Sequence, residues 1–363
     1  GMKLTGDDAA IDKALTSLYD AGEGSRRAGL GGSSPYVARW LGDIRKYFPK
    51  DAVTMMQKDA IERLDLQRLL LEPELLDEVE PDIHLVGTLL SLKHLIPSKT
   101  KDSARRVVQA VVREVEKRLA EKTKNAVRGA IDRTRRSRRP RANEIDWDRT
   151  IRANLNNYIP ERQALIPERL VGHSRKQKRT LQEIILCVDQ SGSMAPSVVY
   201  SAIFGAVLSS ISTVKTQMVV FDTAVVDLTE DLKDPVDLLF GCQLGGGTDI
   251  HKALTYCSQL VTKPEQTVMV MITDLYEGGD RIAMLKRAKG LVDSGVNLIC
   301  LLALSDEGAP MFDPRNASAM TELGVPCFGC TPDLFPDLIA AAIQRQDIAA
   351  WAAKHDIVLR KGG

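Results

Sequence analysis

The sequence has few cysteines, no long apolar run and no visible export signal, and each shortage argues against a class of protein. Six cysteines in 363 residues are too few for a disulfide-built scaffold and favour a reducing compartment. No apolar stretch is expected to reach the roughly 18 residues that span a bilayer. The first ten residues, GMKLTGDDAA, lack the basic and apolar regions of a secretory signal. We therefore expect a cytoplasmic protein without a membrane span.

The composition is that of an ordinary globular protein, with 44% hydrophobic and 27% charged residues. The length is long for one domain and comfortable for two. The net charge of +1 hides an asymmetry, because residues 101–180 carry 23 Lys/Arg and 10 Asp/Glu. That segment is therefore at +13, and the remainder of the chain must sum to −12.

The N-terminal half has the pattern of helices. We expect a flexible segment over residues 1–33 and a helical region with a basic stretch over 34–179. Ser34 and Pro35 suit the N-cap and first position of a helix. Its apolar residues recur at helical spacing: Val37, Trp40, Leu41, Ile44 and Phe48. A longer helix is expected from Asp102, with one apolar face: Val108, Val111, Val112, Val115 and Leu119.

The pattern changes near residue 180. Apolar runs of strand length, LQEIILCV, TQMVVFD, TVMVMIT and VNLICLLAL, alternate with helical segments at 197–212, 250–261 and 280–294. Alternating strands and helices indicate parallel βαβ units. We therefore predict a doubly wound, mainly parallel α/β domain over residues 180–363, with helices on both faces of the sheet and at the C-terminus. In such folds, ligands bind beyond the carboxyl ends of the strands, where the strand order reverses.

Oxygen-bearing side chains gather after the predicted strands. The first strand ends in DQSGS, the sequence GGGTD opens a later helix, and TDLYEGG follows a third strand. The candidate ligands are Asp189, Ser191, Ser193, Thr248 and Asp274. Hydroxyls and carboxylates without His or Cys suit a hard cation, with Mg²⁺ preferred and Mn²⁺ or Ca²⁺ as alternatives. Because several of these ligands are neutral, the ion would keep positive charge and an exchangeable position that suits a partner's carboxylate.

This set resembles the metal-ion-dependent adhesion site of von Willebrand factor A-like (VWA) domains, whose pattern is D-x-S-x-S followed by a distant Thr and a distant Asp. In that family the serines and the threonine contact the ion, and the aspartates often act through water. The resemblance implies a Rossmann-like fold over about residues 180–345. One departure is TDLYEGG, where many relatives have Thr-Asp-Gly. It places Glu277 near the site, with Asp249 beside Thr248, and leaves the roles of both carboxylates open.

A helical N-terminal half followed by IILCVDQSGSM more closely resembles the CoxE-like, MoxR-associated subgroup. By that resemblance, the protein is a non-catalytic, cation-dependent binding module. The resemblance also implies that it is an adaptor for a MoxR-type AAA+ ATPase in the assembly or remodelling of client complexes. The partner or its client would offer the Asp or Glu carboxylate to the ion.

Two other classes compete with this interpretation. The basic run RTRRSRRPR, Arg133–Arg141, suits nucleic acid or an acidic protein face, although the absence of aromatics within it argues against base stacking. A hydrolase is disfavoured because Ser193 lacks a G-x-S-x-G elbow, and His251 near Thr248 is more typical of a structural histidine. The single C-x-x-C, Cys327–Cys330, lacks a second pair for zinc and is interpreted as ordinary buried thiols.

Overall fold

The chain forms two compact units, each assembled from several stretches of sequence. The computed structural model describes residues 11–12, 15–16, 34–63, 76, 79–134, 136–137, 145–160, 164–173, 182–242, 244–304 and 311–357. The first unit comprises Gly1–Lys117, Gln190–Ile203 and Asp234–Gly247, and the second comprises Arg118–Asp189, Phe204–Lys233 and Thr248–Gly363.

Helices build the first unit, as the sequence predicted for the N-terminal region. They are α2 (Ser34–Tyr47), α3 (Lys50–Arg63), α5 (Ile83–Ser91), α9 (Pro235–Gly241) and the N-terminal parts of α6 (Lys101–Thr134) and α8 (Ala195–Ser209). The predicted apolar positions Trp40, Leu41 and Ile44 are buried. The ammonium of Lys93 donates to the carbonyls of Phe240, at 3.0 Å, and Cys242. The ammonium of Lys93 thereby supplies hydrogen bonds to carbonyls at the C-terminal end of α9.

Helix α6 confirms the long helix expected from Asp102. It runs without interruption from Lys101 to Thr134. The five positions expected on its apolar face are all buried: Val108, Val111, Val112, Val115 and Leu119. Because they recur every three or four residues, they lie along one side of the helix.

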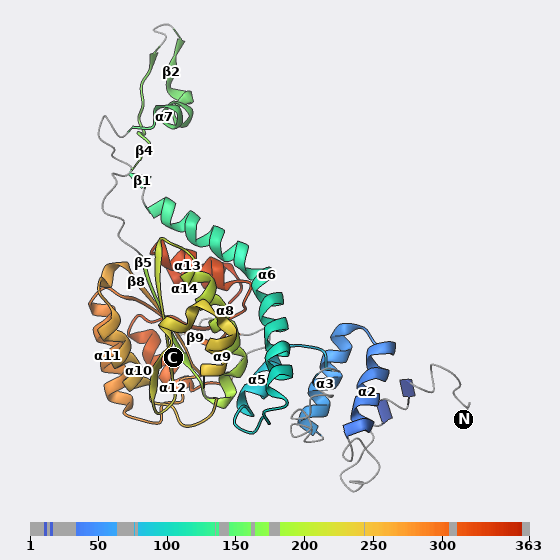
Figure 1. The fold of residues 1–363 in the computed structure, drawn as a ribbon. Coiled ribbons are helices and arrows are strands. Elements are labelled where there is room, and N and C mark those ends of the chain that lie inside the picture. The colour runs from blue at the N-terminus through green and yellow to red at the C-terminus, as the bar shows by residue number, and fades with distance from the viewer. Residues whose placement is uncertain are drawn as a thin grey trace. The chain divides into compact units, whose positions relative to one another are not determined.

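A six-stranded, mainly parallel sheet forms the centre of the second unit, in the order β10-β9-β8-β5-β6-β7. Strands β5, β8 and β9 of this sheet are labelled in Figure 1. Its strands are β5 (Gln182–Asp189), β6 (Val214–Phe221), β7 (Val225–Asp227), β8 (Thr267–Ile272), β9 (Asn297–Leu304) and β10 (Cys327–Cys330). Only β7 pairs antiparallel, with β6. The α/β fold class predicted from residue 180 is confirmed.

Helices cover both faces of this sheet, and successive side chains along each strand point to opposite faces. Ile185 and Cys187 of β5 join a core with α10 (Ile250–Leu260), α11 (Arg281–Asp293) and α12 (Pro314–Glu322). On the other side, the C-terminal part of α8 packs with α13 (Phe335–Ile343), where the rings of Phe204 and Phe335 lie 4.4 Å apart. The short α14 (Ile348–Lys354) follows α13.

Helix α8 corrects one expectation from the sequence. Within the described residues, Gly192–Ser209 is long and apolar enough to cross a membrane by length and composition. The expectation that no stretch reaches this length was therefore wrong. However, 67% of the window is buried inside the protein, as in a helix of the protein core.

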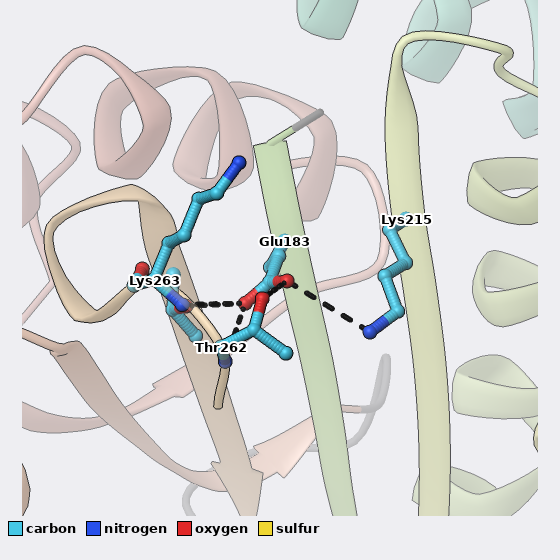
Figure 2. A network of polar contacts seen from close by, with 5 residues as sticks. Glu183, Lys215, Thr262 and Lys263 are labelled. Atoms are coloured by element: carbon cyan, nitrogen blue, oxygen red, sulfur yellow. Dashed lines mark hydrogen bonds and ion pairs between the residues drawn. The ribbon is translucent and has the colours of Figure 1, made fainter. Parts of the chain in front are cut away.

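A buried carboxylate links three strands at the amino-terminal edge of the sheet (Figure 2). Glu183 of β5 lies directly across from Lys215 of β6 and Thr267 of β8. Its oxygens accept hydrogen bonds from the hydroxyl of Thr262, from Thr262 N at 3.1 Å, from Lys263 N at 3.3 Å and from Thr267 Oγ1 at 3.0 Å. Lys215 Nζ lies 3.8 Å away. Burial opposes ionisation, but these hydrogen bonds outweigh it and lower the pKa of Glu183.

The segment between α6 and β5 contains several small elements of the second unit. They are β1 (Arg136–Ser137), α7 (Trp147–Ala153), β2 (Tyr158–Ile159), β3 (Ala164–Leu165) and β4 (Gly172–His173). Polar side chains hold it together: the buried amide of Asn154 accepts from Glu168 N and Arg169 N, each at 3.0 Å. Trp147 is 55% exposed, so it belongs to no described core.

Candidate functional site

The predicted site lies where the strand order of the sheet reverses. The chain passes from β5 to β6 on one side and later returns to β8 on the other side of β5. Parallel neighbours end at the same edge, and Val188 of β5 pairs with Ile272 of β8. Asp189, the last residue of β5, and Asp274, two residues past β8, are therefore brought to one edge of the sheet.

The Asp189 carboxylate is held by a residue that the sequence analysis did not single out. Asp189 is fully buried, and its Oδ2 accepts a 2.7 Å hydrogen bond from Thr273 Oγ1. The same hydroxyl accepts from Leu275 N at 3.1 Å, while Thr273 N donates to Leu301 O of β9. Thr273 thus orients the carboxylate from the neighbouring strand. The position of Thr273 directly before the predicted ligand Asp274 was the signal in the sequence that could have identified it.

A sharp turn places Asp274. Leu275 has a φ of 62°, a left-handed conformation that is rare for a bulky side chain. Its side chain is nevertheless fully buried, so core packing stabilises the strained backbone. Asp274 is 6% exposed, its Oδ1 accepts from Tyr276 N at 3.3 Å, and its carbonyl accepts from Asp313 N at 2.9 Å.

Thr248 is positioned by the loop that follows Asp274. It lies two residues before α10 and is 9% exposed. Its carbonyl accepts from Gly278 N at 2.8 Å. The next residue, Asp249, donates from its backbone N–H to Asp222 O, just past the end of β6. Thr248, Asp189 and Asp274 belong to the same compact unit.

The structure assigns roles to Asp249 and Glu277 at the start of α10. Asp249 is the N-cap, and its carboxylate accepts from Lys252 N at 2.8 Å. Glu277 Oε2 accepts from Ile250 N at 2.7 Å. Burial raises the pKa of Glu277, the hydrogen bond from Ile250 N opposes this rise, and the nearby Asp249 carboxylate adds to it. Both carboxylates therefore satisfy the exposed backbone donors at the helix start.

The two serines follow Asp189 within four residues along the chain, in the stretch that belongs to the first unit. Their hydroxyl oxygens lie 3.3 Å apart, and Met194 N donates to Ser191 O at 2.9 Å in a turn of 3-10 helix, Gly192–Met194. Ser193 is exposed. Among the described residues, no group of three or more His, Cys, Asp or Glu is arranged to hold a metal ion.

Gly278→Ala is expected to lower the free energy of unfolding by about 1–3 kcal/mol. A Cβ at this position would lie 2.9 Å from the carbonyl oxygen of Thr248, so the backbone that carries Thr248 must move. Gly290→Ala in α11 is the matched control, because its Cβ would meet nothing within 4 Å. It is expected to stabilise by up to about 1 kcal/mol. Urea unfolding measures both, and equal stability of the two variants would contradict the close packing at Thr248.

The remaining candidates have different outcomes. Cys327 and Cys330 lie on β10 and are buried, as expected, and burial raises the pKa of the Cys330 thiol to about 12. His251 is half-buried on α10. The arginine run Arg133–Arg141 lies mostly outside the described residues: 135 and 138–141 fall there, and no side chain of the run is described.

The fold and the order of these motifs define a von Willebrand factor A-like domain. The chain matches the family of VWA domain containing CoxE-like proteins over residues 119–338, more than half of its length, and it belongs to that family. It is 36% identical over 346 residues to the uncharacterized protein YehP of Escherichia coli (strain K12), covering 93% of this chain and 92% of YehP.

Two solved structures are similar over part of the chain. An aerotolerance-related membrane protein from Bacteroides fragilis NCTC 9343, with multiple mutations to serines, is 16% identical with a TM-score of 0.37. That match covers 45% of this chain and 99% of the other. A von Willebrand factor type A protein from Catenulispora acidiphila is 12% identical with a TM-score of 0.34, covering 48% of this chain and 43% of the other.

Proposed function

We propose that this VWA protein binds a divalent cation, Mg²⁺ in the first place, through Asp189, Ser191, Ser193, Thr248 and Asp274. The observation that carries the proposal is the pair of buried carboxylates at neighbouring strand ends, with Thr248 held in the same unit. Buried carboxylates cost free energy unless positive charge or hydrogen bonds compensate them. Their oxygens, together with three hydroxyls, form a donor set that suits a hard cation.

The cation would serve protein binding. Three of its five ligands are neutral hydroxyls, so the bound ion keeps charge for a carboxylate from a partner. We propose that the partner is a MoxR-type AAA+ ATPase or its client, and that this protein is a non-catalytic adaptor in assembly or remodelling. Membership of the CoxE-like family supports this choice. The six cysteines, all free and buried, support a reducing, cytoplasmic location.

The test is a pull-down of a MoxR-type ATPase with the full chain, in Mg²⁺ and in EDTA. Chelation is expected to remove most of the captured ATPase. Without the ion, the site is a cluster of carboxylates that repels the partner's carboxylate. Thr248→Ala is expected to reduce capture less, since it removes one neutral ligand and no charge. A complex that survives EDTA, with folding confirmed by circular dichroism, would rule out docking through the ion.

A further inference from the structure

A trough runs between α10 and α11 on the surface of the second unit, with a cavity volume of about 580 Å³. This volume lies within the range of ordinary ligand pockets. Each helix contributes one face: His251 and Ser258 are seven residues apart on α10, and Ala283, Gly290 and Ser294 recur along and just past α11. The small side chains on α11 leave the space open, and a Cβ on Gly290 would meet nothing within 4 Å.

The rim of the trough is cationic. Lys286 and Arg287 line it and are exposed, and neither has an acidic partner among the described residues. Lys289 of the same helix differs, because it pairs with Asp293. None of the described residues that line the trough is acidic. Both charges lack an acidic partner in the part of the chain that the structure describes, and they are therefore available to an anionic group.

The hydroxyls in the trough favour a peptide over a simple anion. Ser258 Oγ donates to Thr255 O, and Ser294 Oγ donates to Leu291 O, each at 2.7 Å. Their protons are thus used within their own helices, and each oxygen presents lone pairs to a ligand. A peptide N–H can donate to these acceptors, whereas an anion without a proton to donate cannot. The buried side chain of Leu291 adds an apolar floor.

We propose that this trough binds a short acidic peptide segment of a partner protein. From His251 to Ser258 the helix rises about 10 Å, which corresponds to roughly three or four residues of extended chain. Carboxylates of the segment pair with Lys286 and Arg287, its backbone N–H groups donate to the serine hydroxyls, and its apolar side chains contact the floor. This site is separate from the proposed cation site and does not need the ion.

The experiment measures fluorescence anisotropy of a fluorescein-labelled hexapeptide, Glu-Leu-Glu-Glu-Leu-Glu, with the full chain in EDTA. Gly290→Leu is expected to weaken binding about tenfold or more, because the new side chain fills the trough. Gly129→Leu is the matched control and should bind as wild type does, since Gly129 is also a helical glycine whose added Cβ would meet nothing within 4 Å. Both changes replace glycine by a better helix former, so folding is retained.

The second part of the experiment tests the role of charge. Lys286→Glu with Arg287→Glu is expected to abolish binding, and a peptide with lysine in place of glutamate should not bind wild type. Inorganic phosphate should not compete beyond its ionic strength. Equal binding by wild type and Gly290→Leu, binding that survives the charge reversal, or no binding by wild type would each overturn the proposal. Because EDTA is present throughout, these outcomes are independent of the cation site.

Discussion

Asp189→Asn is expected to weaken Mg²⁺ binding by at least about tenfold, since loss of a group just outside a metal's ligands already costs about 10–100-fold in affinity. The asparagine has the same size, and its amide oxygen can still accept the hydrogen bond from Thr273 Oγ1. The fold should therefore survive, while the negative charge at the end of β5 is lost. Asp274→Ala is expected to act in the same direction, since that carboxylate lies past the neighbouring strand. Isothermal titration calorimetry with Mg²⁺ measures both.

Asp347→Asn is the matched control for this experiment. Asp347 is the N-cap of α14 and accepts from Ala349 N and Ala350 N, and asparagine caps helices about as well as aspartate. It removes one carboxylate from the same unit without touching the predicted ligands. Equal Mg²⁺ affinity in wild type, Asp189→Asn and Asp274→Ala would show that these carboxylates lie outside any cation site.

The central strands could be predicted because their burial is complete. In β5 and β8 nearly every side chain is buried on one face or the other, and such strands appear in sequence as short continuous apolar runs. The two edge strands were not predicted. β7 has three residues, and β10 contains CFGC, whose cysteines drew attention to metal chemistry. Short strands at a sheet edge carry too few apolar residues to be recognised.

The residues of the candidate site could be predicted from the sequence, but the residues that hold them in place could not. The motif order named Asp189, Thr248 and Asp274, and alternating strands and helices implied a shared sheet edge. The residues that hold them depend on tertiary contacts between loops that are distant in sequence. Glu277 contacts the start of α10, 27 residues away, and Thr273 reaches Asp189 across 84 residues. Neither spacing is visible as a local pattern.

Glu183 shows the same limit at the opposite edge of the sheet. It lies within an apolar run, where a lone charged residue has no evident role in the sequence. The structure gives it three hydrogen-bond donors from the stretch between α10 and β8, and a fourth from Thr267 at the start of β8. An ionised carboxylate in such a position is stabilised by its donors, and the donors depend on it in turn.

Glu183→Ala is expected to lower the free energy of unfolding by about 1–3 kcal/mol, because the buried hydroxyl of Thr267 and three partly buried donors lose their acceptor at once. Lys215→Met should cost less than about 1 kcal/mol, since the lysine is partly exposed and 3.8 Å from the carboxylate. Glu265→Ala, an exposed carboxylate near the same edge, is the control and should stay within about 0.5 kcal/mol of wild type. Urea unfolding at neutral pH measures all three.

The same carboxylate is expected to make stability depend on pH. The pKa of Glu183 is lowered in the folded protein, so its contribution is complete above the unfolded pKa of about 4.3. It is lost as the pH falls through the lower, folded value, because protonation removes the acceptor charge. The stability difference between wild type and Glu183→Gln should therefore be largest above about pH 5 and should shrink below about pH 4. A difference that stays constant from about pH 7 to about pH 3.5 would show that Glu183 is not ionised in the folded protein.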